Sequence, residues 1–400
     1  MTRDLSNAAT WGAATKLIRG GTNRSGFDET CEAIFMSSGY VYATAREAEE
    51  AFKGERSRFV YSRFANPTVQ MFETRLALLE GASLCRATAT GMAAVFASLA
   101  SQLRTGDRLV SSRALFGSCH YVVSEILPAF GIVSELVDGR DLDAWKRALA
   151  QPAACVFLET PSNPMLDIVD ISEVCRLARK AGAKVVVDNV FASPILQKPL
   201  ELGADIVVYS ATKHIDGQGR CLGGAILTND QDYVETRLTP FLRHTGPALS
   251  PFNAWLLLKG LETLDLRIDR HCRNALAIAE HLAARNDVAR ILHPGLISHP
   301  QHDLAMRQMR DGGTIVTIDV EGGREEAFRF LDAMQIIDIS NNLGDSKTLA
   351  THPATTTHQR FTPEQREELG IRESTVRLSI GLEDRTDLID DLDQALAGIN

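Results

Sequence analysis

The sequence predicts an α/β protein, with a mostly parallel sheet in a large domain and a smaller α+β domain after it. Short runs rich in apolar and β-branched residues alternate with helical stretches between positions 108 and 209. Strands that are apolar along their whole length are typical of a parallel sheet covered by helices on both faces. Beyond about residue 258 the helices become longer and the strands fewer, which indicates a second domain. At roughly 100–200 residues per domain, a chain of 400 residues suffices for two or three such units.

The expected elements follow in order along the chain. The first 60 or so residues have no sustained period and predict an irregular arm. Helical spacing then predicts a helix over 71–79, which stops at Gly81, and a second helix over 92–103. Strands are expected at 108–111, 132–137, 155–158, 184–187 and 205–209. Helical stretches separate them, such as the one over 171–181 between the third and the fourth strand. A long apolar helix over 251–264 is the expected bridge into the second domain, whose strands are 314–320 and 375–380. The expected organisation is therefore an N-terminal arm over 1–62, a large domain over 63–258 and a small domain over 259–400.

Composition and charge argue against several classes of partner. With 51 acidic and 42 basic residues the formal net charge is −9, which disfavours nucleic acid or an anionic membrane as the main partner. No apolar run approaches the roughly 20 residues that cross a bilayer, and the N-terminus lacks an apolar signal core, so we expect a cytoplasmic protein. The 7 cysteines are scattered and never spaced C-x-x-C, which favours reduced thiols over disulfides or a zinc site.

The common short motifs of cofactor and metal sites are missing. The nearest approach to a dinucleotide-binding loop is Gly217-Gln218-Gly219 followed by Gly223, in which the last glycine comes one residue too late. The P-loop, H-E-x-x-H and G-x-S-x-G patterns are absent. Two groups of histidines lack carboxylate partners at ligand spacing, so no metal is expected at His293, His299, His302, His352 or His358.

The ends of two expected strands carry a lysine and an aspartate. Asp188 follows the strand over 184–187, and Lys213 follows the strand over 205–209. Because the carboxyl ends of parallel strands line one crevice, both side chains should face a single site. A lysine there can form an imine with a carbonyl cofactor, and a carboxylate can hold a pyridinium nitrogen. Each residue alone has an ordinary explanation as a turn, cap or packing residue, and only their combination indicates a shared site.

Phosphate ligands and an aromatic ring complete this pattern. Ser210 and Thr212 flank the lysine and offer hydroxyl groups. Gly91 and Met92 open an apolar helix, whose free N–H groups favour an anion. Phe116 offers a ring for stacking. Together these groups suit pyridoxal 5′-phosphate (PLP), which is the cofactor that the sequence predicts.

Several separate motifs also stand in a familiar order. They are Tyr61-Ser62-Arg63 with Asn66-Pro67-Thr68, Ala89-Thr90-Gly91-Met92, Glu159-Thr160-Pro161-Ser162-Asn163-Pro164, Val187-Asp188-Asn189, Tyr209-Ser210-Ala211-Thr212-Lys213-His214 and Arg377-Leu378-Ser379-Ile380-Gly381-Leu382-Glu383. Over nearly its whole length the chain thus resembles the PLP-dependent enzymes of cysteine and methionine metabolism, the trans-sulfuration family. The resemblance implies the PLP-dependent transferase fold type I, which is aspartate aminotransferase-like and has a mostly parallel seven-stranded sheet in its large domain.

The resemblance implies a role for each matched residue. Lys213 is expected to bind the cofactor as an imine and to transfer protons, and Asp188 to bind the pyridine nitrogen. The phosphate is expected to be held by Gly91, Met92, Ser210 and Thr212, with Arg63 and the catalytic residue Tyr61 reaching in from a neighbouring subunit. Phe116 is expected to stack on the cofactor ring, and Asn163 to lie beside the phenolic oxygen of the cofactor. Arg377 is expected to bind the α-carboxylate of the substrate, and Ser340 either to contact the substrate or to serve as a plain loop cap. A site shared between subunits implies a dimer, and the family implies a homotetramer built as a dimer of dimers.

One position bears on the choice of reaction. Phe116 stands where many relatives, the γ-lyases especially, have a tyrosine, and phenylalanine has no hydroxyl with which to transfer a proton. The stretches 115–118 and 244–255 resemble the O-succinylhomoserine sulfhydrylase branch most. The expected reaction is therefore γ-replacement, in which O-succinyl-L-homoserine and sulfide give L-homocysteine and succinate in methionine biosynthesis.

Several alternatives stay open at this point. Within the family they are cystathionine γ-synthase, O-acetylhomoserine sulfhydrylase and a methionine or cystathionine γ-lyase. Outside it stands a non-catalytic binding protein on the same fold. The residue that binds the distal succinyl carboxylate is also open, with Arg58 and Arg113 as candidates.

Overall fold

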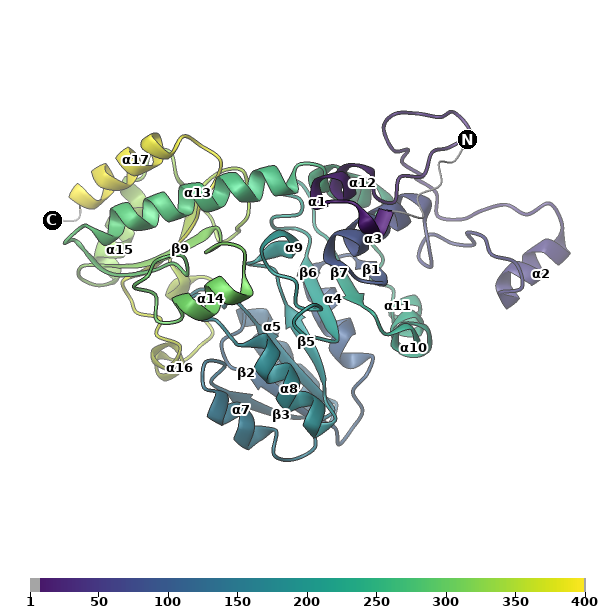
Figure 1. Ribbon diagram of the computed structural model, residues 1–400, viewed down its shortest axis with the longest axis horizontal. Coiled ribbons are helices and arrows are strands. Elements are labelled where there is room, and N and C mark those ends of the chain that lie inside the picture. The colour runs from purple at the N-terminus through teal and green to yellow at the C-terminus, as the bar shows by residue number, and fades with distance from the viewer. Residues whose placement is uncertain (1–7, 399–400) are drawn as a thin grey trace.

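Two β-sheets of unequal size organise the chain, of which the computed structural model describes residues 8–398 (Figure 1). The larger sheet has 7 strands in the order β1-β7-β6-β5-β4-β2-β3. Its strands are β1 (Leu84–Thr88), β2 (Arg108–Ser112), β3 (Val133–Val137), β4 (Cys155–Glu159), β5 (Lys184–Asp188), β6 (Ile206–Ser210) and β7 (Gly224–Thr228). β7 is antiparallel to both neighbours, and the other pairs are parallel. The predicted α/β fold with a mostly parallel seven-stranded sheet is confirmed.

The strands β1 and β7 were missing from the sequence prediction. β1 reads Leu-Cys-Arg-Ala-Thr and β7 begins with glycine, so neither has the run of β-branched residues that marks the other strands. They pair with each other, with Leu84 opposite Thr228 and Thr88 opposite Gly224. Pairing across the fold, which no local pattern reports, therefore makes these two segments strands.

Helices cover both faces of the large sheet. Val185 and Val187 pack on one face beneath α8 (Ile171–Ala181), and Val186 packs on the other beneath α4 (Gly91–Ala100). Helix α8 begins after Asp170, whose side chain accepts a hydrogen bond from the Glu173 amide, and it ends at Gly182 in the left-handed region. The predicted helix over 171–181 is confirmed. Because successive side chains point to opposite faces and both faces are covered, strands such as β4 and β5 are buried along their length and therefore apolar throughout.

The other helical segments before the bridge are mostly short. From the N-terminus they are η1 (Ala8–Thr10), α1 (Ala13–Arg19), α2 (Ala45–Lys53), α3 (Pro67–Glu80), α5 (Gly117–Tyr121), η2 (Val122–Ile126), α6 (Leu127–Ala129), α7 (Leu142–Ala148), α9 (Ser193–Leu196), α10 (Gln231–Tyr233), η3 (Val234–Leu238) and α11 (Thr239–Thr245). None of the helices in residues 8–398 is both long and apolar enough to cross a membrane.

The predicted helix over 251–264 is wrong in one respect, because the structure has two helices there. α12 (Pro251–Leu261) ends two residues before α13 (Leu264–Ala283) begins, and the longer α13 runs along the top of the molecule into the smaller domain (Figure 1). Leu264, Ile268 and Cys272 belong to the core beneath α3 and α12. One turn later Ala275 and Ile278 belong to the core of the smaller sheet. Helix α13 therefore passes from the hydrophobic core of the large domain into that of the small domain. The domain limits of 63–258 and 259–400 stay a prediction.

The smaller sheet has 5 strands in the order β10-β11-β12-β9-β8. They are β8 (Val288–Leu292), β9 (Ile315–Val320), β10 (Asp338–Ile339), β11 (Leu349–Thr351) and β12 (Thr375–Ser379). The helical segments of this part are α14 (His302–Gln308), α15 (Arg324–Ala333), η4 (Pro353–Thr355), α16 (Pro363–Glu368) and α17 (Arg385–Ala397). Except for β10 and β11, the strand pairs are antiparallel.

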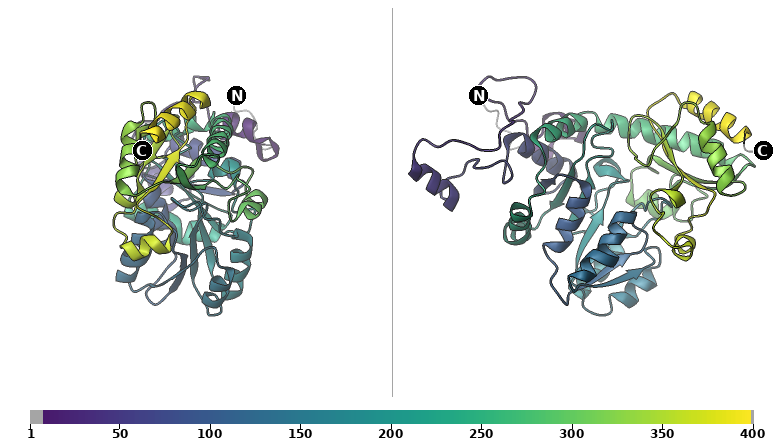
Figure 2. Two further views of the ribbon diagram at one scale, coloured as in Figure 1. Left: turned by 90° about the vertical axis from the view of Figure 1, so that its left-hand side faces the viewer. Right: turned by 180° about the vertical axis from the view of Figure 1, so that it is seen from behind.

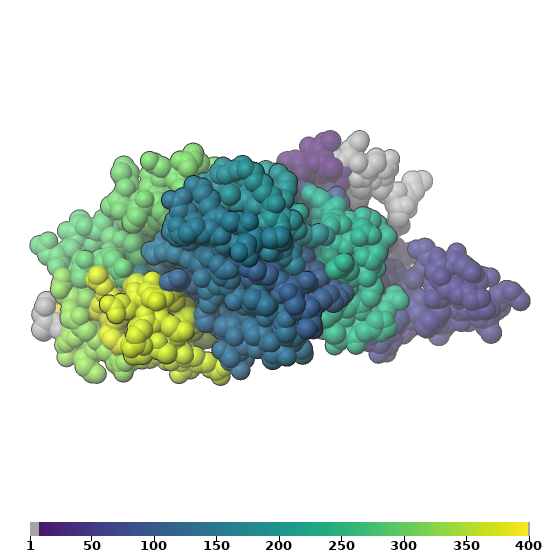
Figure 3. Space-filling model, turned by 90° about the horizontal axis from the view of Figure 1, so that it is seen from below, coloured from purple at the N-terminus to yellow at the C-terminus, as the bar shows by residue number. Residues whose placement is uncertain are grey.

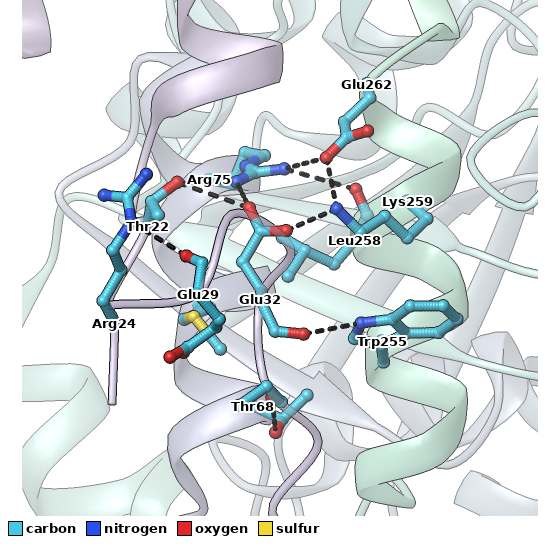
Figure 4. Close-up of polar contacts among 12 residues, drawn as sticks. Thr22, Arg24, Glu29, Glu32, Thr68, Arg75, Trp255, Leu258, Lys259 and Glu262 are labelled. Atoms are coloured by element: carbon cyan, nitrogen blue, oxygen red, sulfur yellow. Dashed lines mark hydrogen bonds and ion pairs between the residues drawn. The ribbon is translucent and has the colours of Figure 1, made fainter. Parts of the chain in front are cut away.

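The N-terminal arm is fastened to the body at one place and extends away from it at another. Its segment 36–60, which carries α2, projects from the body at the end opposite the small domain (Figures 2 and 3). Before that projection, Glu32 is buried and accepts hydrogen bonds from Arg75 of α3, at 2.5 Å, and from Lys259 of α12 (Figure 4). The indole of Trp255 donates to the Glu32 carbonyl at 2.9 Å. A buried ion cluster therefore fixes the root of the arm.

Candidate active site

A cavity of about 230 Å³ opens at the carboxyl ends of β4, β5 and β6, beside the N-terminus of α4. Residues from the large sheet and from the small domain line it together. Most of the site residues predicted from the sequence are among them, namely Gly91, Met92, Phe116, Asn163, Asp188, Ser210, Thr212, Lys213 and Arg377. The fold thus brings residues that are far apart in sequence to one place. This agrees with the rule that the carboxyl ends of parallel strands line one crevice.

Lys213 lies three residues after β6 with its amine in this cavity. Its Nζ donates a hydrogen bond to Asn342 Oδ1 at 2.6 Å, and Asn342 belongs to the loop between β10 and β11. Burial lowers the pKa of Lys213 to about 8, and the positive charge of Arg377 acts in the same direction. Lowering of the pKa from 10.5 to about 8 increases the fraction of free amine at neutral pH, and the free amine is the form that reacts with a carbonyl group.

Two buried carboxylates stand side by side at the ends of β4 and β5. Glu159 pairs with Asp188 across the two strands, and both side chains line the cavity. Burial raises the pKa of Asp188 to about 7. Burial and the charge of Asp188 raise the pKa of Glu159 well above its ordinary value.

The two carboxylates differ in their hydrogen bonds. Glu159 accepts from the amides of Phe116, at 2.7 Å, and Asn163, at 3.1 Å, so it fixes the backbone of both residues. Asp188 accepts from the Val190 amide at 3.1 Å, and within residues 8–398 no basic side chain forms an ion pair with it. A buried acid that faces a cavity without a cationic partner fits a protonated ring nitrogen of a bound cofactor.

The start of α4 forms a close cradle with Ser210. A Cβ atom at Gly91 would lie 2.5 Å from the Cβ of Ser210, so no larger residue fits here without displacement. In the described part of the chain the amides of Gly91 and Met92 have no hydrogen-bond partner, since the N-cap Thr90 accepts from Ala93 instead. Free amides at a helix N-terminus suit a phosphate. The hydroxyl of Thr212, by contrast, is already bonded to the backbone of Gly223.

Arg377 on β12 is 1% exposed and reaches the cavity from the small domain. Its guanidinium donates to Asn163 Oδ1 at 3.0 Å and to the carbonyls of Asn341 and Asn342 at 3.0 and 2.9 Å. Its buried Nε has no partner, and no carboxylate in residues 8–398 forms an ion pair with it. Burial lowers its pKa to about 10, opposed by Glu159. A buried guanidinium with an unused donor is suited to a substrate carboxylate.

These features fit PLP. Asp188 would hold the ring nitrogen, the Gly91 cradle with Ser210 would hold the phosphate, and Lys213 would react with the carbonyl. Phe116 lines the same cavity and offers its ring for stacking.

Three predicted residues lie outside this cavity in the same chain. Tyr61 is 40% exposed, and Arg63 donates to the Arg243 carbonyl while its guanidinium lies 5.2 Å from the Tyr61 ring centre. Ser340 lines a neighbouring cavity, which also contacts Phe116. The predicted roles of all twelve residues as ligands and catalysts stay predictions.

Sequence reasoning gave no role to two residues that the structure brings into the site. Glu159 was part of a quoted motif, and the strand-end rule that selected Asp188 would have selected it too. Asn342 lies two residues after the predicted contact Ser340, but its bond to Lys213 depends on how the two domains pack. Within residues 8–398 no group of three or more His, Cys, Asp or Glu side chains lies close enough to hold a metal.

Comparisons with known proteins show which proteins the chain resembles in sequence and in fold. A family model described as Cys/Met metabolism PLP-dependent enzyme matches residues 14–397. The chain is 56% identical to an O-succinylhomoserine sulfhydrylase from Mycobacterium tuberculosis, over 96% of this chain and 95% of that protein. It is 46% identical to an O-succinylhomoserine sulfhydrylase from Pseudomonas aeruginosa, over 99% and 97%. The crystal structure of a putative O-acetylhomoserine (thiol)-lyase from Campylobacter jejuni, which carries N′-pyridoxyl-lysine-5′-monophosphate, superposes with a TM-score of 0.91 at 32% identity, over 97% and 100%.

Proposed function

The chain belongs to the Cys/Met metabolism PLP-dependent enzymes, and from this membership we propose that it converts O-succinyl-L-homoserine and sulfide to L-homocysteine and succinate. PLP is the cofactor of this family. The observation that carries the proposal is the likeness to two O-succinylhomoserine sulfhydrylases at 56% and 46% identity over nearly the whole chain. The enzyme is thus a PLP-dependent transferase that acts on an amino-acid substrate.

In the proposed reaction the residues of the site cavity bind both the cofactor and the amino-acid part of the substrate. When PLP is bound, it supplies an electron sink that stabilises negative charge on the substrate carbons. Arg377 binds the α-carboxylate, and its unused Nε supports this role. Asp188 keeps the ring nitrogen of the cofactor protonated, and Glu159 holds the backbone on which Phe116 covers the ring.

Proton transfers in the proposed reaction are assigned to Lys213. Its Nζ removes a proton from Cα and then one from Cβ, so that succinate leaves from Cγ. After sulfide has bonded to Cγ in its place, the amine returns protons to Cβ and Cα. The lowered pKa, about 8, supports this assignment, because such an amine both accepts and releases a proton near neutral pH. Phe116 offers no hydroxyl for these transfers.

The proposed assembly is a homotetramer, in which the arm over 1–62 completes the site of a neighbouring subunit in the cytoplasm. Two observations support a shared site. Tyr61 and Arg63 lie outside the cavity of their own chain. The projecting arm also presents Val41, at 91% exposure, and Phe52, at 69%, which are apolar side chains that a second subunit would cover.

The test is turnover of purified holoenzyme with O-succinyl-L-homoserine and sulfide, L-cysteine or no nucleophile, with products identified by mass. Homocysteine with sulfide as the dominant product supports the proposal. Cystathionine as the dominant product, or 2-oxobutanoate without a thiol, contradicts it and leaves the family membership intact.

A further inference from the structure

A second cavity adjoins the active site. It measures about 730 Å³ and shares Phe116 and Asn341 with the site cavity. Ser340, which the sequence predicted on the substrate side, lines it as well. When the amino-acid part of a substrate lies between Lys213 and Arg377, a group attached to its side chain would extend past Phe116 into this space.

The lining of the second cavity has a distinct chemical character. Apolar rings and hydroxyl groups make up much of it, including Tyr121, Phe361 and Thr356. No acidic side chain is among its described lining residues, and Arg360 is the one basic side chain there. A cavity with an apolar wall and one positive charge suits a short aliphatic chain that ends in an anion.

Arg360 is available to bind such an anion. Its guanidinium lies 5.8 Å from the centre of the Tyr121 ring, which supports the side chain from one side. Within residues 8–398 it makes no hydrogen bond and no ion pair, and it is exposed. The planar fork of an arginine binds a carboxylate through two parallel hydrogen bonds.

The two arginines considered from the sequence are already engaged. Arg113 donates to Glu368 at 3.0 Å. Arg58 pairs with Glu47, donates to the Val41 carbonyl at 2.7 Å and stacks on Tyr42, all within the arm. Neither lines the second cavity.

We propose that Arg360 binds the distal carboxylate of the acyl group and thereby makes the enzyme select a succinyl ester over an acetyl ester. The inference rests on the proposed function, because it assigns a specificity residue to that reaction. An acetyl ester carries no second carboxylate, so it gains nothing from Arg360. The carboxylate of a cysteine nucleophile is the other anion that this cavity suits. An assay that uses sulfide as the nucleophile contains no cysteine, so it reports on the acyl carboxylate alone.

The test compares Arg360→Met with the wild-type holoenzyme, using sulfide and either O-succinyl- or O-acetyl-L-homoserine. Methionine keeps an unbranched side chain beside Tyr121 and removes the charge. We expect KM for the succinyl ester to rise about tenfold, with KM for the acetyl ester changed less than twofold. Arg360→Lys should recover part of the loss. The matched control is Arg113→Met, which should leave the ratio of the two KM values unchanged.

A second readout does not depend on turnover. Titration of the holoenzyme with O-succinyl-L-homoserine without sulfide, followed by the cofactor absorbance, should give a Kd about tenfold higher for Arg360→Met. Equal Kd values in wild type and variant, or equal losses for both esters, overturn the inference even when wild type forms homocysteine. Absence of homocysteine from wild type, with a Kd that depends on Arg360, contradicts the proposed function and leaves the inference standing.

Discussion

Lys213 at the end of a strand of the large sheet donates to Asn342 in a loop of the small domain at 2.6 Å. The amine is therefore oriented by a residue 129 positions away in sequence. Arg377, which reaches the same cavity, is fixed by the carbonyl of that same asparagine at 2.9 Å. One loop of the small domain thus positions both cationic groups of the site.

Replacement of Asn342 by alanine should lower kcat with O-succinyl-L-homoserine and sulfide about tenfold, because a hydrogen bond to a charged group contributes roughly 1.5 kcal/mol or more. The Asn342 carbonyl that binds Arg377 is retained, so KM should change little. Steady-state kinetics checks both values. The control is Asn286→Ala, at an exposed position between α13 and β8. An equal loss of kcat in that control would refute the role of the Lys213 contact.

The pH dependence of stability should report on Asp188. In the protein without cofactor its pKa is raised by burial from 3.8 to about 7. Between these values the folded state binds more protons than the unfolded state, so the stability that Asp188 contributes falls as pH rises through this window. Asp188→Asn should remove a slope of up to about 1.4 kcal/mol per pH unit.

Denaturant unfolding of cofactor-free wild type and Asp188→Asn at pH 4–7 measures this slope. In the holoenzyme a protonated ring nitrogen would hold Asp188 ionised, so the wild-type slope should decrease when PLP is added. The same slope in wild type and variant without cofactor would disprove the assignment.

Gly91→Ala should weaken cofactor binding at least tenfold, because the new Cβ would lie 2.5 Å from the Cβ and 2.8 Å from the Cα of Ser210. Overpacking of this kind displaces the backbone and costs about 1–3 kcal/mol. Titration of the cofactor-free protein with PLP gives the Kd. Gly26→Ala is the matched control, since a Cβ there meets nothing within 4 Å. Unchanged PLP affinity in Gly91→Ala would exclude the phosphate cradle.

Glu32→Gln should destabilise the protein by about 3 kcal/mol, because it removes the charge that compensates the fully buried Arg75. Burial works to raise the pKa of Glu32, but hydrogen bonds from Lys259 and Arg75 lower it to about 2. The stability that Glu32 contributes is therefore present above its ordinary pKa of 4.5 and is lost as pH falls toward 2.

Thermal or denaturant unfolding at pH 7 and pH 3 measures both effects of Glu32. The difference between wild type and Glu32→Gln should be smaller at pH 3. Glu49→Gln, which removes the exposed ion pair with Lys53 in the projecting part of the arm, is the control and should cost less than 1 kcal/mol, as is typical of surface ion pairs (about 0–1 kcal/mol). An equal cost for both variants would contradict the role of the buried cluster.

The sequence predicted those parts of the fold and site that depend on local pattern or on one topological rule. Apolar strands and capped helices, such as β5 and α8, have signals in their own residues. Asp188 and Lys213 followed from the rule that parallel strands end at one edge. The break between α12 and α13 at residues 262–263 was not predicted, because the helical spacing of apolar residues continues across it.

The contacts that depend on distant partners could not be predicted in this way. β1 and β7 become strands by pairing with each other, and Asn342 meets Lys213 through the packing of the domains. Arg360 belongs to the same class, because its place beside the substrate cavity comes from the fold of the small domain around η4. Its nearest sequence neighbours, Gln359 and Phe361, line that cavity too but give no signal of an anion site.

Helix α13 has a consequence for how the molecule unfolds. Its first half completes the hydrophobic core beneath α3 and α12, and its second half completes the core of the smaller sheet. Because one continuous hydrogen-bonded helix is shared, melting of either core would fray the other, and the two halves lose their structure cooperatively. A fragment cut at residue 258 would lack Leu264, Ile268 and Cys272, so the large sheet alone would expose an apolar furrow to water. We therefore expect the large domain to be less stable as a fragment ending at residue 258 than within the full chain.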